Sequence, residues 1–277
     1  MATRTRIGRF QVEAFVDYAP PPFNPRDFFP DVTERDWEPH RAHHALDADG
    51  KFRTNFGAFV IRSEDCLVLV DTGIGPGVGD AFKSGGGRLP QQLARMGVNP
   101  ESVTAVVTTH LHGDHVGWNL TDGELTFPNA RYVVSQTDWD HWTEKNVLEK
   151  SAHIRSQAIP LRELGVLDLS ADGYQVAPGL RVVATPGHTP GHQSLLIESD
   201  GDRGLIMGDI IHSRAQINQP EWCAGFDMDK PTAIATRKRV IEQAVRENMT
   251  LAAGHLLLDT NIGHVVEVKG QRYWSVL

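Results

Sequence analysis

The sequence predicts an α/β fold, in which apolar strands alternate along the chain with helices. Two observations indicate this class. The strand-like runs at 56–62 and 66–70 are apolar at nearly every position, as is typical of strands covered on both faces. Metal-binding side chains also follow several apolar runs directly, and active-site groups of α/β folds gather at the carboxyl ends of strands. No linker or low-complexity tract divides the 277 residues, so we expect one domain over 1–277.

The first 45 residues are expected to form a strand and then an extended arm. Residues 7–16 alternate in hydropathy and predict the strand, whereas residues 18–40 are rich in Pro and Phe. Such a segment either packs on the body as a structural arm or covers a substrate site as a lid.

The remaining elements follow in a regular order. A glycine-rich loop over 73–87 precedes a helix over 89–98 that Gly97 closes. Asp229 is expected to cap the last long helix, with Pro231 in its first turn. Strands are expected near 102–109, 130–135, 174–199, 204–211 and 251–255, helices over 137–152 and 231–249, and only a short tail from residue 261.

Composition excludes several kinds of partner. The net charge is −8, with 27 basic and 35 acidic residues and no basic cluster, so we expect no nucleic-acid ligand. No apolar run reaches the roughly 18 residues of a membrane span, and the opening residues lack the apolar core of a signal peptide. The two cysteines, Cys66 and Cys223, are expected to be reduced, which together indicates a cytoplasmic protein.

The segment THLHGDH at 109–115 is the most informative in the chain. It follows the apolar run SVTAVVT and places His110, His112, Asp114 and His115 within six residues. In an extended segment residues i and i+2 face the same way, so the first two histidines can bind one metal. The last two residues lie beyond Gly113 and can reach a second metal. The alternative is a solvated, histidine-rich loop.

Four later residues extend this pattern. Asp71, His188, Asp209 and His255 each follow an apolar, strand-like run and occupy its carboxyl end. The sequence therefore predicts that these side chains gather with the histidine motif at one site.

These motifs resemble those of the metallo-β-lactamase superfamily. The matching segments are VDTG at 70–73, THLHGDH at 109–115, TPGHTPGH at 185–192, GD at 208–209 and GH at 254–255. The resemblance implies a four-layer αββα sandwich that binds two divalent ions, with zinc first and manganese, iron or cobalt as alternatives. It further implies one ion on His110, His112 and His188, the other on Asp114, His115 and His255, and Asp209 bridging the two.

Such a site implies hydrolysis by a hydroxide shared between the ions, because two close metals lower the pKa of a bridging water. Asp114 is a candidate for passing a proton to the leaving group. His212 occupies the place where the related lactonases commonly have a tyrosine, and we expect it to donate to the substrate oxyanion. The alternative is that His212 only packs in a loop.

Further residues are expected to support the site. Asp71 is expected to accept a hydrogen bond from a ligand imidazole, and His192 to play a similar part; the alternatives are a turn-capping aspartate and a structural histidine. Aromatic side chains are expected to line an apolar pocket, or else to be ordinary core: Trp118, Trp222, Phe226 and Phe28, with Phe23 and Phe29 as further candidates. The histidines at 40, 43, 44, 141, 153 and 264 are interpreted as surface or loop residues.

Within the superfamily, the chain resembles the quorum-quenching lactonases and the methyl parathion hydrolase-like group, and the segments 115–119, 127–135 and 208–229 are most similar to the second of these groups. The predicted function is hydrolysis of lactones or carboxylic esters (EC 3.1 type), with acyl-homoserine-lactone-like molecules or aryl esters as substrates. An organophosphate triester hydrolase is the alternative in the same fold. A mononuclear-iron persulfide dioxygenase and a non-catalytic metal-binding module are alternatives of other classes. A homodimer formed through the N-terminal arm is a further hypothesis.

Overall fold

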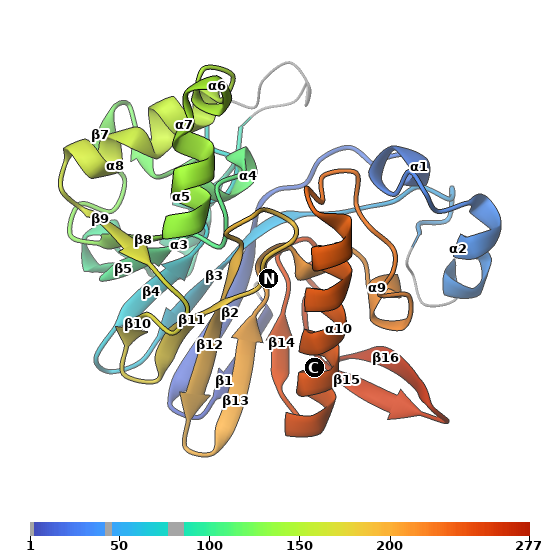
Figure 1. The fold of residues 1–277 in the computed structure, drawn as a ribbon. Coiled ribbons are helices and arrows are strands. Elements are labelled where there is room, and N and C mark those ends of the chain that lie inside the picture. The colour runs from blue at the N-terminus through green and yellow to red at the C-terminus, as the bar shows by residue number, and fades with distance from the viewer. Residues whose placement is uncertain (1–2, 42–45, 77–85) are drawn as a thin grey trace.

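Two seven-stranded β-sheets pack face to face, and helices cover their outer faces, which gives the four layers expected of an αββα sandwich (Figure 1). The computed structural model describes residues 3–41, 46–76 and 86–277. The first sheet has the order β1-β2-β3-β4-β5-β8-β9, and the second runs from β10 to β16 in sequence order.

The first sheet is antiparallel from β1 to β4 and parallel from β4 through β5 and β8 to β9. The parallel part places the carboxyl ends of β4 and β5 side by side, because Val70 pairs with Val107. The strands are β1 (Thr3–Ile7), β2 (Phe10–Tyr18), β3 (Phe56–Arg62), β4 (Leu67–Val70), β5 (Ala105–Val107), β8 (Arg131–Ser135) and β9 (Leu167–Ser170).

The second sheet is antiparallel except where β13 and β14 run parallel. Strands β11, β13 and β14 therefore share one direction, and their carboxyl ends lie at the same edge. The strands are β10 (Gln175–Ala177), β11 (Leu180–Ala184), β12 (Gln193–Ser199), β13 (Asp202–Ile206), β14 (Thr250–Ala252), β15 (Ile262–Val268) and β16 (Gln271–Val276); β6 (Leu120–Thr121) and β7 (Glu124–Leu125) form a separate small ladder.

The helices divide between the two outer faces and the N-terminal arm. Helix α10 packs against the second sheet, and α3 and α5 pack against the first (Figure 1). The helices are α1 (Pro25–Phe28), α2 (Glu34–Arg41), α3 (Leu89–Arg95), α4 (Gly113–Val116), α5 (Gln136–Thr143), α6 (Lys145–Leu148), α7 (Ala152–Gln157), α8 (Ile159–Glu163), α9 (Ala215–Asn218) and α10 (Lys230–Glu247), with short 3-10 turns at Pro100–Ser102 and Gly208–Ile210.

The largest core lies between the sheets. Val12, Phe59 and Val107 of the first sheet pack in one cluster with Leu195 and Ile206 of the second. Separate clusters lie under α3 and under α10, on the outer faces of the two sheets. Apolar burial on both faces of each sheet explains why the strands are apolar at nearly every position.

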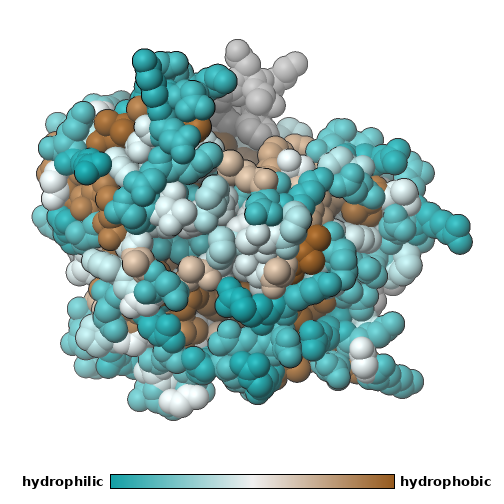
Figure 2. Space-filling model, in the orientation of Figure 1, coloured by the Kyte–Doolittle hydropathy of each residue, from teal (hydrophilic) through white to brown (hydrophobic). Residues whose placement is uncertain are grey.

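Most predicted elements are present, and some are confirmed closely. Residues 56–62 form β3, α3 ends before Gly97 at φ +65°, and the Asp229 side chain caps α10 by accepting from the Thr232 amide at 3.1 Å. The described helices lack any segment long and apolar enough to cross a membrane. In Figure 2 the visible face is largely hydrophilic, with hydrophobic side chains in small groups.

Other predicted elements need correction. The strand expected over 7–16 is two strands, β1 and β2, joined by a turn. The helix expected over 137–152 is divided into α5, α6 and the start of α7. The segment from residue 261 is not a mere tail but the hairpin β15–β16. Of the glycine-rich loop predicted over 73–87, residues 77–85 lie outside the described part.

Candidate metal centre

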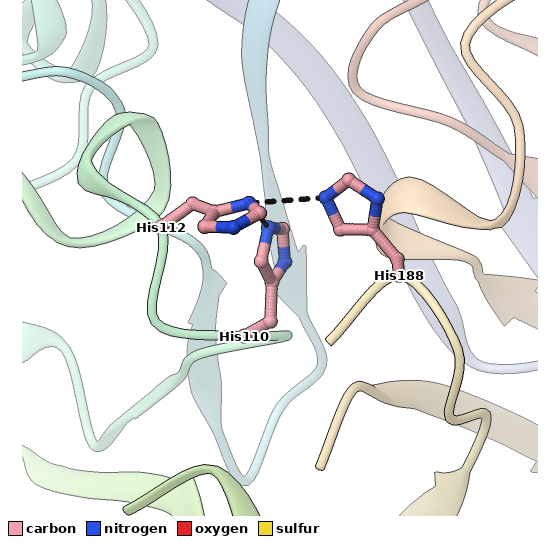
Figure 3. Close-up of side chains that lie close together, drawn as sticks. All are labelled: His110, His112 and His188. Carbon is pink, nitrogen blue, oxygen red and sulfur yellow. Dashed lines mark hydrogen bonds between the residues drawn. The ribbon is translucent and has the colours of Figure 1, made fainter. Parts of the chain in front are cut away.

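Three histidines converge where two strands of different sheets end. His110 and His112 follow β5, and His188 lies in the loop between β11 and β12. His112 Nδ1 lies 2.9 Å from His110 Nε2 and 3.0 Å from His188 Nε2, so the three rings point at one another (Figure 3). Tetrahedral zinc with nitrogens at about 2.1 Å holds them about 3.4 Å apart, which is close to this spacing. The trio is a candidate site for one metal ion.

A second group lies beside the first. Asp114 and His115 belong to the short helix α4, and His255 follows β14. The Asp114 carboxylate lies 3.6 Å from the Nε2 atoms of both His115 and His255. The turn at Gly113 thus separates the motif into two pairs, as the sequence predicts, and the second pair meets a residue of the other sheet.

Asp209 lies between the two groups, in the 3-10 turn that follows β13. Its Oδ1 lies 3.4 Å from His115 Nε2, while its Oδ2 lies 3.3 Å from His188 Nε2 and 2.9 Å from His255 Nε2. The carboxylate therefore contacts residues of both groups, which is the position required of a bridging ligand. All seven candidate ligands of the sequence analysis are brought together here.

In four of the candidate ligand histidines, the Nδ1 atom, which faces away from the centre, has a partner of its own. His115 Nδ1 lies 2.8 Å from Asp71, His188 Nδ1 2.8 Å from Asp227, and His255 Nδ1 2.7 Å from the carbonyl oxygen of Asn55. His110 Nδ1 lies 3.1 Å from the Thr109 hydroxyl. A partner on the far nitrogen fixes the ring and its tautomer, leaving Nε2 directed at the centre.

Asp71 adopts a conformation that L residues seldom use. Its φ is +62°, directly after β4, and its carboxylate accepts from the Thr109 amide at 2.7 Å and from the Thr109 hydroxyl at 2.8 Å. Strained backbone of this kind costs about 1–3 kcal/mol and persists where its surroundings fix it. The predicted hydrogen bond to Asp71 is present and comes from the imidazole of His115, a candidate ligand.

His192 and His212 differ in their positions. His192 Nε2 accepts from the Asp209 amide at 2.9 Å, so it supports the bridging residue from behind. His212 Nε2 lies 3.1 Å from Asp209 Oδ2, and its Nδ1 has no hydrogen-bond partner. With His188 and Asp209 it forms a further group able to bind a metal.

Burial and mutual charge set the protonation of the centre. Burial, with the charges of neighbouring imidazoles, lowers the pKa values of His110 and His112 well below their ordinary range. Burial also lowers the pKa of His212 to about 4. Although burial opposes it, the carboxylates of Asp209 and Asp114 raise the pKa of His115. Neutral imidazoles keep the lone pairs that metal binding needs.

The donor set fits divalent ions. His115 Nε2 and Asp209 Oδ1 are buried without a hydrogen-bond partner, and they face one another at 3.4 Å. Buried polar atoms of this kind are costly unless something binds them, and a cation between them would satisfy both. Imidazole and carboxylate donors suit zinc and its first-row neighbours.

A largely apolar cavity of about 320 Å³ opens onto the centre. Phe28 lines it, with its ring 5.4 Å from that of His212 and 5.5 Å from that of Phe226. Phe28 comes from the N-terminal arm, and Phe226 from the loop before α10. The full lining is Phe23, Phe28, Phe56, Ile74, His112, Gly113, Asp114, His188, Asp209, His212, Phe226 and His255.

Three of the expected pocket residues are elsewhere. Trp118 is buried in the core under α3, where its Nε1 donates to Asp17 at 3.0 Å, because α4 turns it away from the cavity. Trp222 packs against Trp37 of the arm and does not line the cavity; Phe29 is buried in the same cluster.

The histidines interpreted as surface or loop residues differ in their burial. His40 is buried against Trp222, and His153 Nε2 donates to the Leu111 carbonyl at 3.0 Å, so neither is a plain surface residue. His141 and His264 are half-buried, and His43 and His44 lie outside the described residues.

The sequence reasoning did not identify two carboxylates that contact the candidate site. Asp227 holds His188, and Asp138 accepts from the amides of Leu111 and Gly191 at 2.9 and 2.7 Å, tying together the two histidine-bearing loops. Asp227 lies inside the segment 208–229 that carried the resemblance, and that similarity was the only signal for it.

Comparison with known proteins agrees with this geometry. The curated N-acyl homoserine lactonase AiiA of Bacillus thuringiensis subsp. kurstaki is 26% identical over 213 residues, covering 71% of this chain and 79% of that protein. The solved structure of the hydrolase AbOPH, of the beta lactamase superfamily, is 27% identical with a TM-score of 0.87, and covers 100% of this chain and 97% of its own.

The dizinc quorum-quenching lactonase AidC, solved with a product homoserine, has a TM-score of 0.82 at 20% identity, over 99% of this chain and 96% of its own. At that identity the likeness concerns the fold. The model of the Metallo-beta-lactamase superfamily matches residues 58–255, which include every candidate ligand. The chain belongs to the metallo-β-lactamase superfamily.

Proposed function

We propose that this protein is a dinuclear metal-dependent hydrolase of lactones or carboxylic esters, with acyl-homoserine-lactone-like molecules first among its substrates. The observation that carries the proposal is Asp209, whose two carboxylate oxygens contact histidines of both candidate ligand groups. The relative AiiA, named as an N-acyl homoserine lactonase, supports the choice of substrate.

The seven ligands would hold two divalent ions, most naturally zinc. When bound, such ions supply Lewis-acid polarisation of a carbonyl oxygen and lower the pKa of a coordinated water. Asp209 would hold both ions through its carboxylate. Asp114 is ionised, because His115 and His255 lower its pKa despite burial, so its free oxygen would accept a proton rather than supply one at the outset.

His212 is placed to serve the substrate. Its ring lines the cavity beside Asp209 and stacks on His255 with centroids 5.0 Å apart. Burial keeps the imidazole neutral, so it carries one N–H, which in this structure faces Asp209 Oδ2 at 3.1 Å. With ions bound to the Asp209 carboxylate, this Nε2–H would be available to donate to a developing oxyanion. This is the role expected of it from the sequence.

The apolar cavity favours a hydrophobic substrate. Phe23, Phe28, Phe56 and Phe226 supply aromatic surface around the polar centre, and small-molecule sites commonly combine these features. Aromatic walls can contact an aryl group as well as an acyl chain. Organophosphate triesters that carry an aryl group are therefore the second candidate substrate class. Cytoplasmic location and a homodimer remain predictions.

The experiment that tests the proposal combines elemental analysis with a substrate panel on one preparation. We expect about two metals per chain and turnover of acyl-homoserine lactones or aryl esters. The Asp200→Asn variant, changed at an exposed turn residue, is the control and should match the wild type in metal content and turnover. One iron per chain without hydrolysis would replace the proposal by the oxygenase alternative. Turnover of phosphotriesters alone would select the second candidate.

A further inference from the structure

Arg237 of α10 is buried, yet every nitrogen of its guanidinium has a partner. The side chain is 1% exposed. Nε donates to the Ile210 carbonyl at 2.7 Å, and Nη1 donates to the carbonyls of Pro220 and Trp222 at 2.7 and 2.9 Å. Nη2 donates to Asp227 Oδ2 at 3.3 Å. This one side chain thus binds four residues of the segment between β13 and α10.

The carboxylate of Asp227 continues the chain of contacts to the metal centre. Its Oδ1 lies 2.8 Å from His188 Nδ1, while its Oδ2 also accepts from the Ala224 amide at 3.1 Å. Its side chain is fully buried, like that of Arg237. Buried charges are tolerated when they are paired and hydrogen-bonded, and removing one partner is strongly unfavourable.

These contacts fix which ring nitrogen of His188 faces the metal centre. Because Nδ1 is engaged by Asp227, Nε2 is the nitrogen that faces His112 in the first trio. Arg237 also binds the carbonyl of Ile210, the residue after Asp209. A single side chain of α10 is therefore connected to one candidate ligand through a carboxylate and to the backbone beside another.

We propose that Arg237 is a positioning residue of the metal centre, which acts through Asp227 to fix the orientation of His188. The proposal rests on the proposed function, because it takes His188 as a metal ligand. Removing a group that hydrogen-bonds a metal ligand directly, as Asp227 bonds His188, typically lowers metal affinity by about 10- to 100-fold, and Arg237 acts one contact further away.

The test compares Arg237→Gln with Arg237→Lys and a control, Arg239→Gln. Arg239 lies on the same helix, is exposed and donates to the Ala184 carbonyl at 3.1 Å. Zinc affinity is measured by competition with a chromogenic chelator, and the ligand field by the absorption of the cobalt-loaded protein. Circular dichroism and the melting temperature verify the fold of each variant.

We expect Arg237→Gln to weaken zinc binding by about tenfold, the lower end of that range, and to change the cobalt spectrum, with Arg239→Gln unchanged. Arg237→Lys should rescue part of the loss, because a point charge can reach Asp227 but cannot serve all three carbonyls. Should the glutamine variant fail to fold, the lysine variant takes its place in every comparison.

A double-mutant cycle with Asp227→Asn separates positioning from general support of the fold. If Arg237 acts through Asp227, its replacement should weaken zinc binding little further once Asp227 is Asn. Fully additive losses in zinc affinity would overturn the inference. The inference would also be overturned if the wild type binds two ions and the Arg237→Gln variant binds zinc equally tightly. A wild type that binds no metal would instead refute the proposed function, and the positioning role with it.

Discussion

The carboxylate of Asp209 is surrounded by five imidazole rings, with N–O distances between 2.9 and 3.8 Å. Burial alone would raise its pKa, but the charges of His255, His115 and other neighbours lower it well below the ordinary value. The residue is therefore an anion whose partners are the candidate ligands themselves. Its replacement should affect metal binding far more than folding.

We expect Asp209→Asn to retain the wild-type circular dichroism spectrum, to bind fewer than two ions per chain, and to lose at least about a hundredfold in kcat/KM. The amide keeps the shape of the side chain but cannot supply two anionic oxygens. Elemental analysis and lactone kinetics measure the two effects. Asp200→Asn, in an exposed turn, is the control and should change neither. A fully active variant with two ions would exclude the bridging role.

A second buried carboxylate, Asp17, lies outside the metal centre and makes stability depend on pH. It accepts from the amides of Ile74 and Leu89 at 2.8 and 2.6 Å and from Trp118, but burial outweighs these bonds and raises its pKa to about 6. The ordinary value is 3.8, so the folded state binds the proton more tightly than the unfolded state does.

This contribution to the free energy of unfolding should therefore be full below about pH 4 and decrease as the pH rises to about 6, by up to about 3 kcal/mol. Denaturant unfolding at several pH values measures it, with chelator present so that metal binding does not contribute. Asp17→Asn should lack this decrease, whereas Asp36→Asn, at an exposed site, should keep it. Identical pH profiles for Asp17→Asn and wild type would contradict the assignment.

At the scale of elements, the loop between α9 and α10 supplies the outer wall of the cavity. Phe226 is 55% exposed, lines the cavity and meets the arm at Phe28, whereas Met228 is 48% exposed and does not line it. The two residues have similar exposure and lie on the same loop. They form a matched pair for testing whether the cavity binds the apolar part of the substrate.

Phe226→Ala should reduce kcat/KM for long-chain lactones by about fivefold, mainly through KM, because about 1 kcal/mol of apolar contact with bound substrate is lost. Short-chain lactones should be affected less. Met228→Ala should leave both nearly unchanged. Kinetics across a series of acyl lengths gives the comparison, and equal effects of the two variants would remove the loop from substrate binding.

The elements that carry the candidate ligands were predictable from the sequence, but the residues that hydrogen-bond these ligands were not. His110, Asp209 and His255 each follow an apolar run, and carboxyl ends of parallel strands share one edge, so local pattern sufficed. The pairing of Asp227 with His188 depends instead on a loop held by Arg237, a long-range contact without local spacing. Trp118 was misplaced for a related reason, because the turn of α4 directs it into the core.

The C-terminal hairpin shows the same limit. Strand β15 begins buried at Ile262, but its last three residues are exposed, and every residue of β16 is half-buried or exposed. Without a buried face along the whole length, the hydropathy pattern alternates too weakly to indicate strands. Burial by a distant part of the chain, which a local pattern cannot report, decides these cases.

At the scale of the whole molecule, the candidate ligands come from both sheets. His110 and His115 belong to the first sheet's edge, and His188, Asp209 and His255 to the second. The sheets also pack through their shared apolar cluster and are joined by hydrogen bonds such as the one from Gln193 Nε2 to the Thr108 carbonyl at 2.9 Å. Bound ions would therefore link the two sheets at one edge, and they would be lost when the sheets separate on unfolding.

Removing the metal should consequently lower the melting temperature of the whole domain, with no local change elsewhere. A ligand present at about 1,000 times its Kd stabilises the folded state by about 4 kcal/mol, which corresponds to a shift on the order of 10 °C for a chain of this size. Calorimetry before and after chelation measures the shift, and re-addition of zinc should restore it. Asp209→Asn should show a smaller shift, because it holds fewer ions. A protein that contains two ions by elemental analysis, yet melts at the same temperature with and without chelator, would show that the ions do not link the sheets.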